Sequence, residues 1–379
     1  MRLGVARALV GGEWVEGDVE VLDGRVAAVG VGEPRGTTVA APGFVDLQVN
    51  GYAGVDFSAP GEDGYERAGA ALLAAGVTAF QPTIVTAPIE EMIRALGEMA
   101  AANGAISADE SAHGTDGEPP SGPRLIGVHL EGPFLSRERA GAHDREALRA
   151  PDPERLERLL ASGPVSQVTL APELPGALDL IEVLVERGIT VSCGHTEADA
   201  ATARAAFDRG ASAVTHLFNA MRQPTHRDPG IAYAAFGRDD VFITVIVDRH
   251  HLADDTVRAV ARAAGDRLVL ISDAVAAAAA PDGDYTLGGR IPVHSEDGVV
   301  RNAAGSLAGS ALTMLDGVRN LHALGVPLAT ALAAATEAPA RMARRPELGR
   351  IEPGARADIV VLDDSLELIQ VFLGGEPRR

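Results

Sequence analysis

Four polar residues that each follow a separate apolar run could together form a hydrolytic site. Glu131 follows the run that ends at Leu130, and His195, His216 and Asp273 stand at or just after the ends of three further runs. Imidazole and carboxylate groups with one position left for water are the ligands of zinc-type hydrolytic sites, in which the metal lowers the pKa of the water towards neutrality. One such residue alone is more often a satisfied polar group, but four in register favour a shared site.

The other histidines and the single cysteine fit structural roles better. His113 lies in a polar stretch and His129 inside an apolar run, whereas His294 and His322 lie away from the run ends. Cys193 could be a soft ligand, but a free cysteine is more often a small buried apolar side chain. A single cysteine cannot form an internal disulfide, which agrees with a reducing compartment.

The elements that must position these residues alternate along the middle of the chain. The predicted strands span residues 43–49, 77–85, 124–130, 166–171, 189–193, 213–216, 242–247 and 268–272. Helical stretches rich in Ala, Leu, Arg and Glu lie between them, such as 153–161, 178–187, 198–209 and 254–264. Eight such units predict an α/β fold of the (β/α)8 TIM-like barrel class, which typically takes about 250 residues. An open doubly wound sheet competes, but no strand is followed by a G-x-G-x-x-G turn.

A barrel would bring the four residues together, because catalytic groups lie at the carboxyl ends of its strands. The two ends of the chain have a different character. Residues 1–42 and the last thirty residues predict short strands that pair with each other, since neither segment could bury a core alone. We therefore expect a small β-sandwich domain from residues 1–45 and 350–379, and a catalytic barrel domain from residues 46–349. The polar segment 103–123 predicts a surface loop.

The charge excludes several classes of function. There are 53 acidic and 33 basic side chains, giving a net charge of −20, and every basic residue is arginine. The absence of lysine excludes Schiff-base catalysis, ordinary pyridoxal phosphate chemistry and a phosphate loop of the lysine type. So acidic a chain is not expected to bind nucleic acid or anionic membrane surfaces. It has neither an apolar run of membrane-spanning length nor a signal-peptide core, which predicts a soluble cytoplasmic protein.

Several longer motifs carry a resemblance to a known family. They are Ala41-Pro42-Gly43-Phe44-Val45-Asp46, His129-Leu130-Glu131-Gly132-Pro133-Phe134, Gly141-Ala142-His143, Gly194-His195-Thr196, His216-Leu217-Phe218-Asn219-Ala220-Met221, His226-Arg227-Asp228-Pro229-Gly230, Ser272-Asp273-Ala274, Leu307-Ala308-Gly309-Ser310 and Ala357-Asp358-Ile359-Val360-Val361-Leu362. In this order they resemble the N-acetylglucosamine-6-phosphate deacetylases of the amidohydrolase superfamily, over essentially the whole chain. The second and fifth motifs are specific to that family, whereas the first and last mark only the superfamily.

The resemblance implies roles for the residues that match the family pattern. Glu131, His195 and His216 would hold one divalent metal ion per subunit, with zinc expected and iron, cobalt, manganese, cadmium or nickel as alternatives. Asp273 would act first as the base that deprotonates the attacking water and then as the acid that protonates the departing amine. His251 would polarise the acetyl carbonyl and stabilise the oxyanion.

The resemblance also implies how the substrate is held. Arg227 and His143 would contact the sugar and its phosphate, because a planar guanidinium suits phosphate. Further pocket contacts would come from Ala142, Asn219, Ala220, Leu307 and Ala308. The implied partner is a small phosphosugar. The chain would form a homodimer, or a dimer of dimers, with Arg227 supplied across the interface.

Two departures, the first from the pattern of most amidohydrolases and the second from that of the deacetylase family, bear on these roles. Gln48 and Asn50 stand where most amidohydrolases have two histidines, and neutral amides are much weaker ligands. With no lysine to bridge two ions, this favours a single metal, although Glu131 could still bridge. Arg249 stands where the family usually has glycine, so it would add bulk and charge beside the pocket and leaves the size of the accepted substrate open.

The function that these features imply is metal-dependent removal of the acetyl group from N-acetylglucosamine 6-phosphate, giving glucosamine 6-phosphate and acetate in amino-sugar catabolism or recycling. One alternative is another amidohydrolase that acts on a different N-acyl or cyclic amide. A second alternative is a non-catalytic barrel that serves as an interaction module. Such a module would be expected to lose ligands, and all four strand-end residues are present.

Overall fold

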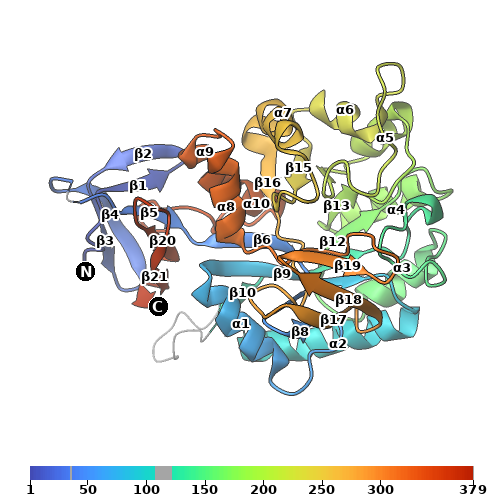
Figure 1. Ribbon diagram of the computed structural model, residues 1–379, viewed down its shortest axis with the longest axis horizontal. Helices are drawn as coiled ribbons and strands as arrows, with labels where there is room; N and C mark the ends of the chain where they lie inside the picture. Colours follow the sequence, from blue (N-terminus) through green and yellow to red (C-terminus); the bar gives the residue numbers. More distant parts are fainter. Residues whose placement is uncertain (35, 107–121, 379) are drawn as a thin grey trace.

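A nearly closed barrel of parallel strands forms the centre of this computed structural model, which describes residues 1–34, 36–106 and 122–378 (Figure 1). The barrel strands are β6 (Phe44–Val49), β9 (Val77–Val85), β11 (Val128–Glu131), β12 (Val165–Leu170), β13 (Thr190–Cys193), β14 (Ala213–Val214), β15 (Phe242–Val245) and β16 (Leu268–Leu270). Each pairs in parallel with the next. The first and last strands meet where Val49 bridges Ala274. The predicted (β/α)8 fold is confirmed.

All eight predicted strands are present, but half of them end earlier than predicted because the residues after them turn into the barrel mouth. The third is also interrupted. β10 (Arg124–Leu125) precedes β11, and Gly127 lies between them at φ 101°. A Cβ atom on Gly127 would stand 2.1 Å from the Oγ atom of Ser166, so the neighbouring strand packs directly against this glycine.

Helices cover the outside of the barrel, as Figure 1 shows. They are α1 (Gly64–Ala74), α2 (Ile89–Ile106), α3 (Pro153–Leu160), α4 (Ala177–Glu186), α5 (Ala200–Asp208), α6 (Gly230–Phe236), α7 (Asp254–Ala264), α8 (Met314–Ala323), α9 (Leu328–Ala333) and α10 (Glu337–Met342). In α4 the buried residues recur at helical spacing, from Ala177 through Leu180 and Ile181 to Leu184, so one face packs inward. None of these helices is long and apolar enough to span a bilayer, within the residues that the structure describes.

Helix boundaries follow local sequence signals. At the start of α3 the Asp152 carboxylate accepts a hydrogen bond from the Arg155 amide at 2.8 Å, and Pro153 occupies the first turn. The loop predicted for residues 103–123 begins too early, because α2 continues its hydrogen-bonded ladder to Ile106. The central part of that loop, residues 107–121, lies outside the described residues.

The two chain ends form one sheet beside the barrel, with both termini at the same end of the molecule (Figure 1). Its strands, in spatial order, are β2 (Glu13–Glu16), β1 (Arg7–Val10), β5 (Val39–Pro42), β20 (Ile359–Leu362), β21 (Leu368–Leu373) and β22 (Glu376–Pro377). A hairpin of β3 (Asp18–Leu22) and β4 (Arg25–Val31) packs against it, sharing a core that includes Val19, Val26 and Ile359. The predicted pairing of the ends is confirmed, and the exact domain boundaries at residues 45 and 350 stay a prediction.

An antiparallel sheet that was not predicted is inserted after the last barrel strand. It consists of β17 (Gly283–Leu287), β18 (Ile291–Glu296) and β19 (Val299–Asn302). The signal was present in the sequence, because alternating apolar residues flank a Gly288-Gly289 turn and an Asp297-Gly298 turn. A second small hairpin, β7 (Gly51–Tyr52) with β8 (Val55–Asp56), follows the first barrel strand.

Two isoleucines on neighbouring strands of the terminal sheet test its packing. Ile359 is fully buried between β5 and β21, so Ile359→Ala should lower the free energy of unfolding by about 2–5 kcal/mol. Ile369 is 47% exposed in β21, so Ile369→Ala should change the free energy of unfolding by only about 0.5 kcal/mol. Denaturant unfolding measures both, and equal losses would contradict the buried core of this sheet.

Candidate functional site

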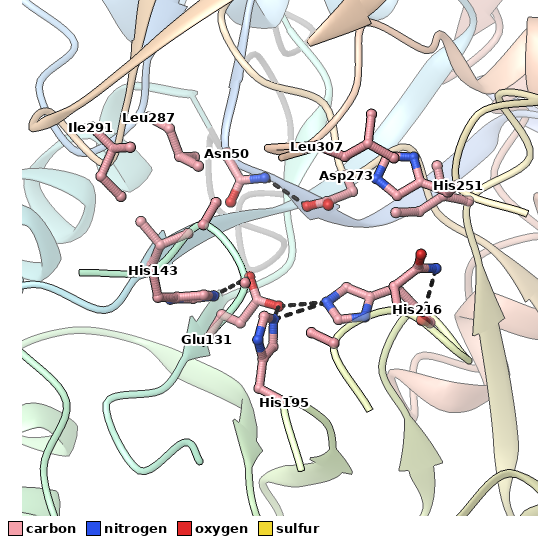
Figure 2. Close-up of a pocket in the computed structure, with 17 residues that line it drawn as sticks. Asn50, Glu131, His143, His195, His216, His251, Asp273, Leu287, Ile291 and Leu307 are labelled. Atoms are coloured by element: carbon pink, nitrogen blue, oxygen red, sulfur yellow. Dashed lines mark hydrogen bonds and ion pairs between the residues drawn. The ribbon is translucent and has the colours of Figure 1, made fainter. Parts of the chain in front are cut away.

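The four strand-end residues converge on one cavity at the mouth of the barrel. Glu131 is the last residue of β11, while His195, His216 and Asp273 follow the ends of β13, β14 and β16 by two or three residues. All four line a cavity of about 190 Å³. Figure 2 shows Glu131 and the two histidines turned towards one another, with Asp273 across the cavity from them. The predicted convergence is confirmed.

The backbone at three of these residues is held in the left-handed region. The φ angles are 47° at His195, 31° at His216 and 48° at Asp273. Residues other than glycine adopt such angles at a cost of about 1–3 kcal/mol each, and they concentrate at functional sites. Each of these turns bends the chain away from the strand direction directly after a barrel strand, at the edge of the shared cavity. No sequence signal indicated this conformation.

Glu131, His195 and His216 place three potential ligand atoms close together. The Oε1 atom of Glu131 lies 3.2 Å from Nε2 of His195 and 3.0 Å from Nε2 of His216, and the two Nε2 atoms are 3.2 Å apart. The Nδ1 atom of His195 donates to the carbonyl oxygen of Arg139 at 2.7 Å. In a neutral ring the Nε2 atom of His195 therefore directs a lone pair, and not a proton, at the carboxylate oxygen. A cation between these atoms fits that arrangement.

The pKa directions of Glu131 and His195 agree with a carboxylate ligand and a neutral imidazole ligand, whereas the pKa of His216 is raised, because its interaction with the Glu131 carboxylate outweighs burial. Burial by itself raises the pKa of Glu131, but its interactions with the three surrounding histidine rings, His143 first, outweigh burial and hold the pKa well below its usual range. Burial, reinforced by the neighbouring His143, lowers the pKa of His195 to about 4. Glu131 is therefore an anion and His195 a neutral ring near pH 7.

His143 lies beside this cluster in a defined tautomer. Its Nδ1 atom accepts a hydrogen bond from the Thr86 amide at 3.3 Å, so the proton of the neutral ring is on Nε2, which faces Oε2 of Glu131 at 3.6 Å. The Thr86 hydroxyl donates to the Glu131 carbonyl at 3.1 Å. Thr86 therefore holds both the backbone of Glu131 and the ring of His143. The sequence did not indicate either contact.

Asp273 is held by two neutral amides. Gln48 and Asn50 each donate a side-chain N–H to its Oδ1 atom, at 3.0 and 2.8 Å. Burial, followed by repulsion from Glu131, raises the pKa of Asp273 to about 6, against the opposing effects of His216, His251 and the amide of Asn50. This carboxyl group can therefore gain and lose a proton close to neutral pH.

His251 lines the same cavity from the loop after β15. Its Nδ1 atom lies 2.7 Å from Oδ2 of Asp248. Although burial raises the pKa of Asp248, hydrogen bonds from His251 and from backbone amides bring it down to about 2, so the carboxylate is ionised and Nδ1 carries a proton. The adjacent His250 is exposed and does not line the cavity. Arg249, also exposed, bonds to Asn320 and does not line the cavity.

The predicted substrate contacts divide into two groups. Ala142, His143, Asn219, Ala220 and Leu307 line the cavity, and Ala308 is buried directly beside them. Arg227 is exposed and does not line it.

Several further lining residues were not predicted, and two of them are apolar residues of the inserted sheet. Leu287 and Ile291 come from the inserted strands β17 and β18, and both are visible in Figure 2. They add an apolar wall to the cavity.

Two residues that the sequence analysis assigned to structural roles have them. His129 is fully buried, with Nδ1 3.1 Å from the Thr83 hydroxyl and Nε2 2.8 Å from the Thr169 hydroxyl. Cys193 is fully buried, and burial raises the pKa of its thiol, which keeps it inert.

Several known proteins are similar to this chain in sequence and in fold. The sequence model of the amidohydrolase family matches residues 39–378. The N-acetylglucosamine-6-phosphate deacetylase of Vibrio furnissii is 35% identical over 362 residues, covering 94% of this chain and 86% of that protein. The N-acetylgalactosamine-6-phosphate deacetylase of Escherichia coli O157:H7 is 35% identical over 372 residues, covering 94% and 93%. A solved variant of the Mycobacterium smegmatis N-acetyl-D-glucosamine-6-phosphate deacetylase, in complex with N-acetyl-D-glucosamine-6-phosphate, matches with a TM-score of 0.89 and 38% identity, covering 99% of this chain and 98% of that chain.

The chain belongs to the amidohydrolase family, among the N-acetylglucosamine-6-phosphate deacetylases. The resemblance read from its motifs is thereby confirmed. Members of this deacetylase group are hydrolases, and amidohydrolase membership implies a divalent metal. Within the described part of the chain, one group of ligand-type residues could hold that ion, formed by Glu131, His195 and His216.

Removal of one ligand should release the metal from this deacetylase. His216→Ala should lower the bound divalent metal from about one equivalent to well below it, because two ligands hold an ion far less tightly than three. The matched control is His322→Ala, since His322 lies in α8 and does not line the cavity, and its ring donates to the Val326 carbonyl at 3.0 Å. Elemental analysis of both purified variants measures this, and equal metal contents would contradict the assignment.

Proposed function

We propose that this chain hydrolyses the acetamide of N-acetylglucosamine 6-phosphate to glucosamine 6-phosphate and acetate. The observation that carries the proposal is the pairing of a Glu131, His195 and His216 cluster with the Asp273 carboxyl group on opposite sides of one cavity. The relatives named for this reaction support the choice of substrate. The alternative of a non-catalytic barrel is disfavoured, because the cluster and the carboxyl group are both complete.

Glu131, His195 and His216 would hold a single divalent ion, with zinc as the proposed metal. When bound, such an ion would polarise the amide carbonyl and lower the pKa of a nearby water. A second ion would need additional anionic or imidazole ligands. Gln48 and Asn50, which occupy the positions of the usual histidine pair, direct N–H groups and not lone pairs at Asp273, which supports one ion per subunit.

Asp273 would transfer the proton in both halves of the reaction. It would take a proton from the water as the water oxygen bonds to the carbonyl carbon. It would then give that proton to the nitrogen as the carbon–nitrogen bond breaks, because an unprotonated amine is a poor leaving group. The raised pKa of about 6 suits a group that must both accept and release a proton near neutral pH.

His251 would stabilise the negative charge that develops on the carbonyl oxygen. Its Nδ1 proton is engaged by Asp248 at 2.7 Å, which fixes the orientation of the ring. The Nε2 atom is then the one available to the substrate, and it would donate to the carbonyl oxygen when the ring is protonated on both nitrogens, with the Asp248 carboxylate stabilising that imidazolium. A donor held in place before the reaction begins avoids the cost of reorganisation as charge develops.

The phosphate would be bound by an arginine from a second subunit. The chain has no lysine, and no arginine of the described residues lines the cavity. Arg227 is exposed in the loop before α6, where its backbone amide donates to the Thr225 hydroxyl at 3.4 Å. In a homodimer, each subunit could present Arg227 to the cavity of its partner. The guanidinium group of Arg227 would then supply the positive charge that binds the substrate phosphate.

The reaction and its base are tested together. Acetate release from N-acetylglucosamine 6-phosphate should exceed release from the unphosphorylated sugar and from an N-acetyl amino acid, and a chelator should abolish it. Asp273→Asn should lower kcat by about a thousandfold or more, with metal content and folding retained, because the amide can accept no proton. Equal rates on all substrates would contradict the proposal, as would near-normal turnover by the variant. N-acetylgalactosamine 6-phosphate is a further substrate arm, given the Escherichia coli relative.

Co-expression of two inactive variants tests the shared site. Arg227→Ala and Asp273→Asn should each be nearly inactive at low substrate concentration. In a mixed dimer, the Arg227→Ala subunit keeps its own Asp273 and receives Arg227 from its partner, so random pairing should restore up to about a quarter of the sites. Activity of the co-expressed mixture measures this. If Arg227 acts within its own subunit, the mixture stays inactive.

A further inference from the structure

Two neutral amides converge on a single oxygen of the proposed base. The Nε2 atom of Gln48 lies 3.0 Å from Oδ1 of Asp273, and the Nδ2 atom of Asn50 lies 2.8 Å from the same atom. All three side chains are at most 7% exposed. No described residue donates a hydrogen bond to the other oxygen, Oδ2.

This arrangement makes the two carboxylate oxygens chemically different. A carboxylate oxygen has two lone pairs, and both lone pairs of Oδ1 are taken by the two N–H donors. A proton can therefore join Asp273 only at Oδ2. We propose that Gln48 and Asn50 are positioning residues for the hydrolysis, which fix Oδ1 of Asp273 so that Oδ2 alone takes and returns the proton.

The backbone holds the two amides in place. The main-chain N–H of Asn50 donates to the main-chain carbonyl of Ala274 at 2.7 Å, and the Ser272 hydroxyl donates to the main-chain carbonyl of Gln48 at 3.3 Å. These bonds lock the end of β6 against the segment that carries Asp273, whose own carbonyl accepts from the Ser310 amide at 2.9 Å. Because the donors and the acceptor are tied to each other through the main chain, the carboxylate plane is set before substrate enters.

Amides suit this role better than charged or titrating groups. Both donors stabilise the carboxylate against burial and against the nearby Glu131, and an amide keeps its N–H groups at every working pH. The Oδ1 atom of Asn50 is buried and has no partner among the described residues, so the side chain is not engaged in a separate structural bond through that atom. Its described side-chain contact is the one to Asp273.

In the reaction, Oδ2 of Asp273 carries the transferred proton in both steps. Oδ2 forms a bond to a proton of water while the water oxygen bonds to the carbonyl carbon. The same Oδ2–H bond breaks when the nitrogen takes the proton and the carbon–nitrogen bond cleaves. If the carboxyl group could rotate, the proton could settle on either oxygen and half of the orientations would be unproductive.

Apolar replacements of similar size test the inference, which rests on the proposed function. Gln48→Met and Asn50→Leu each remove one donor and should lower kcat about 10- to 100-fold, since bonds to charged groups are the stronger ones. KM should stay within about threefold and metal content should be unchanged, because neither residue is proposed to contact substrate or ion. The matched control is Gln81→Met, another buried barrel amide, whose Nε2 atom bonds to the Ser166 hydroxyl at 2.8 Å and not to Asp273.

A second pair of variants guards against misfolding. Gln48→Glu and Asn50→Asp keep the shape of the side chain but replace the N–H donor by a carboxylate oxygen, which also brings a second negative charge beside Asp273, so kcat should fall at least as far as in the apolar variants. The inference is wrong if kcat of the variants at positions 48 and 50 stays within about threefold of the Gln81→Met control. It is equally wrong if their loss appears in KM with kcat kept. Inactivity of the unsubstituted protein would instead defeat the proposed function, so the two failures are distinguishable.

Discussion

The mouth of this barrel depends on a buried carboxylate that is surrounded by imidazole rings. Glu131 is only 3% exposed, and the nearest polar groups to its oxygens are the rings of His143, His195 and His216. A buried charge is tolerated only when it is paired and hydrogen-bonded, so the rings must stay where they are. Two of them are held from behind, His195 by the Arg139 carbonyl and His143 by the Thr86 amide. The left-handed turns after β13 and β14 follow from the need to bring the His195 and His216 rings to this point.

The same low-dielectric cavity gives its two carboxyl groups opposite properties. Glu131 has three imidazole neighbours, and its pKa is held well below its usual range. The Asp273 carboxylate accepts hydrogen bonds from two neutral amides, and burial together with the charge of Glu131 outweighs these bonds and the more distant His216 and His251, so its pKa rises to about 6. Carboxyl groups whose surroundings separate their pKa values are suited to separate roles. One is a permanent anion that can bind a cation, and the other is a group that can exchange a proton.

Much of the site could be predicted because it lies on regular elements. Apolar runs identify the strands, and a residue at the end of a parallel barrel strand has a known place in space. The inserted strands β17 to β19 carried an ordinary hairpin signal and were overlooked, and with them Leu287 and Ile291. The bonds from Gln48 and Asn50 to Asp273 were beyond prediction, because they join the first and last barrel strands across more than 220 residues of sequence. The sequence showed only that these amides are poor ligands.

The amino-acid sequence by itself determined the class of fold, the four strand-end residues and the absence of lysine chemistry, since each of these follows from residue type and spacing along the chain. Tertiary structure decided which atoms face one another. It set the tautomers of His195 and His143, the separate pKa values of Glu131 and Asp273, and the position of Arg227 outside the cavity of its own chain. These properties depend on distances of about 3 Å between residues far apart in sequence, and electrostatic and hydrogen-bond energies change steeply over such distances.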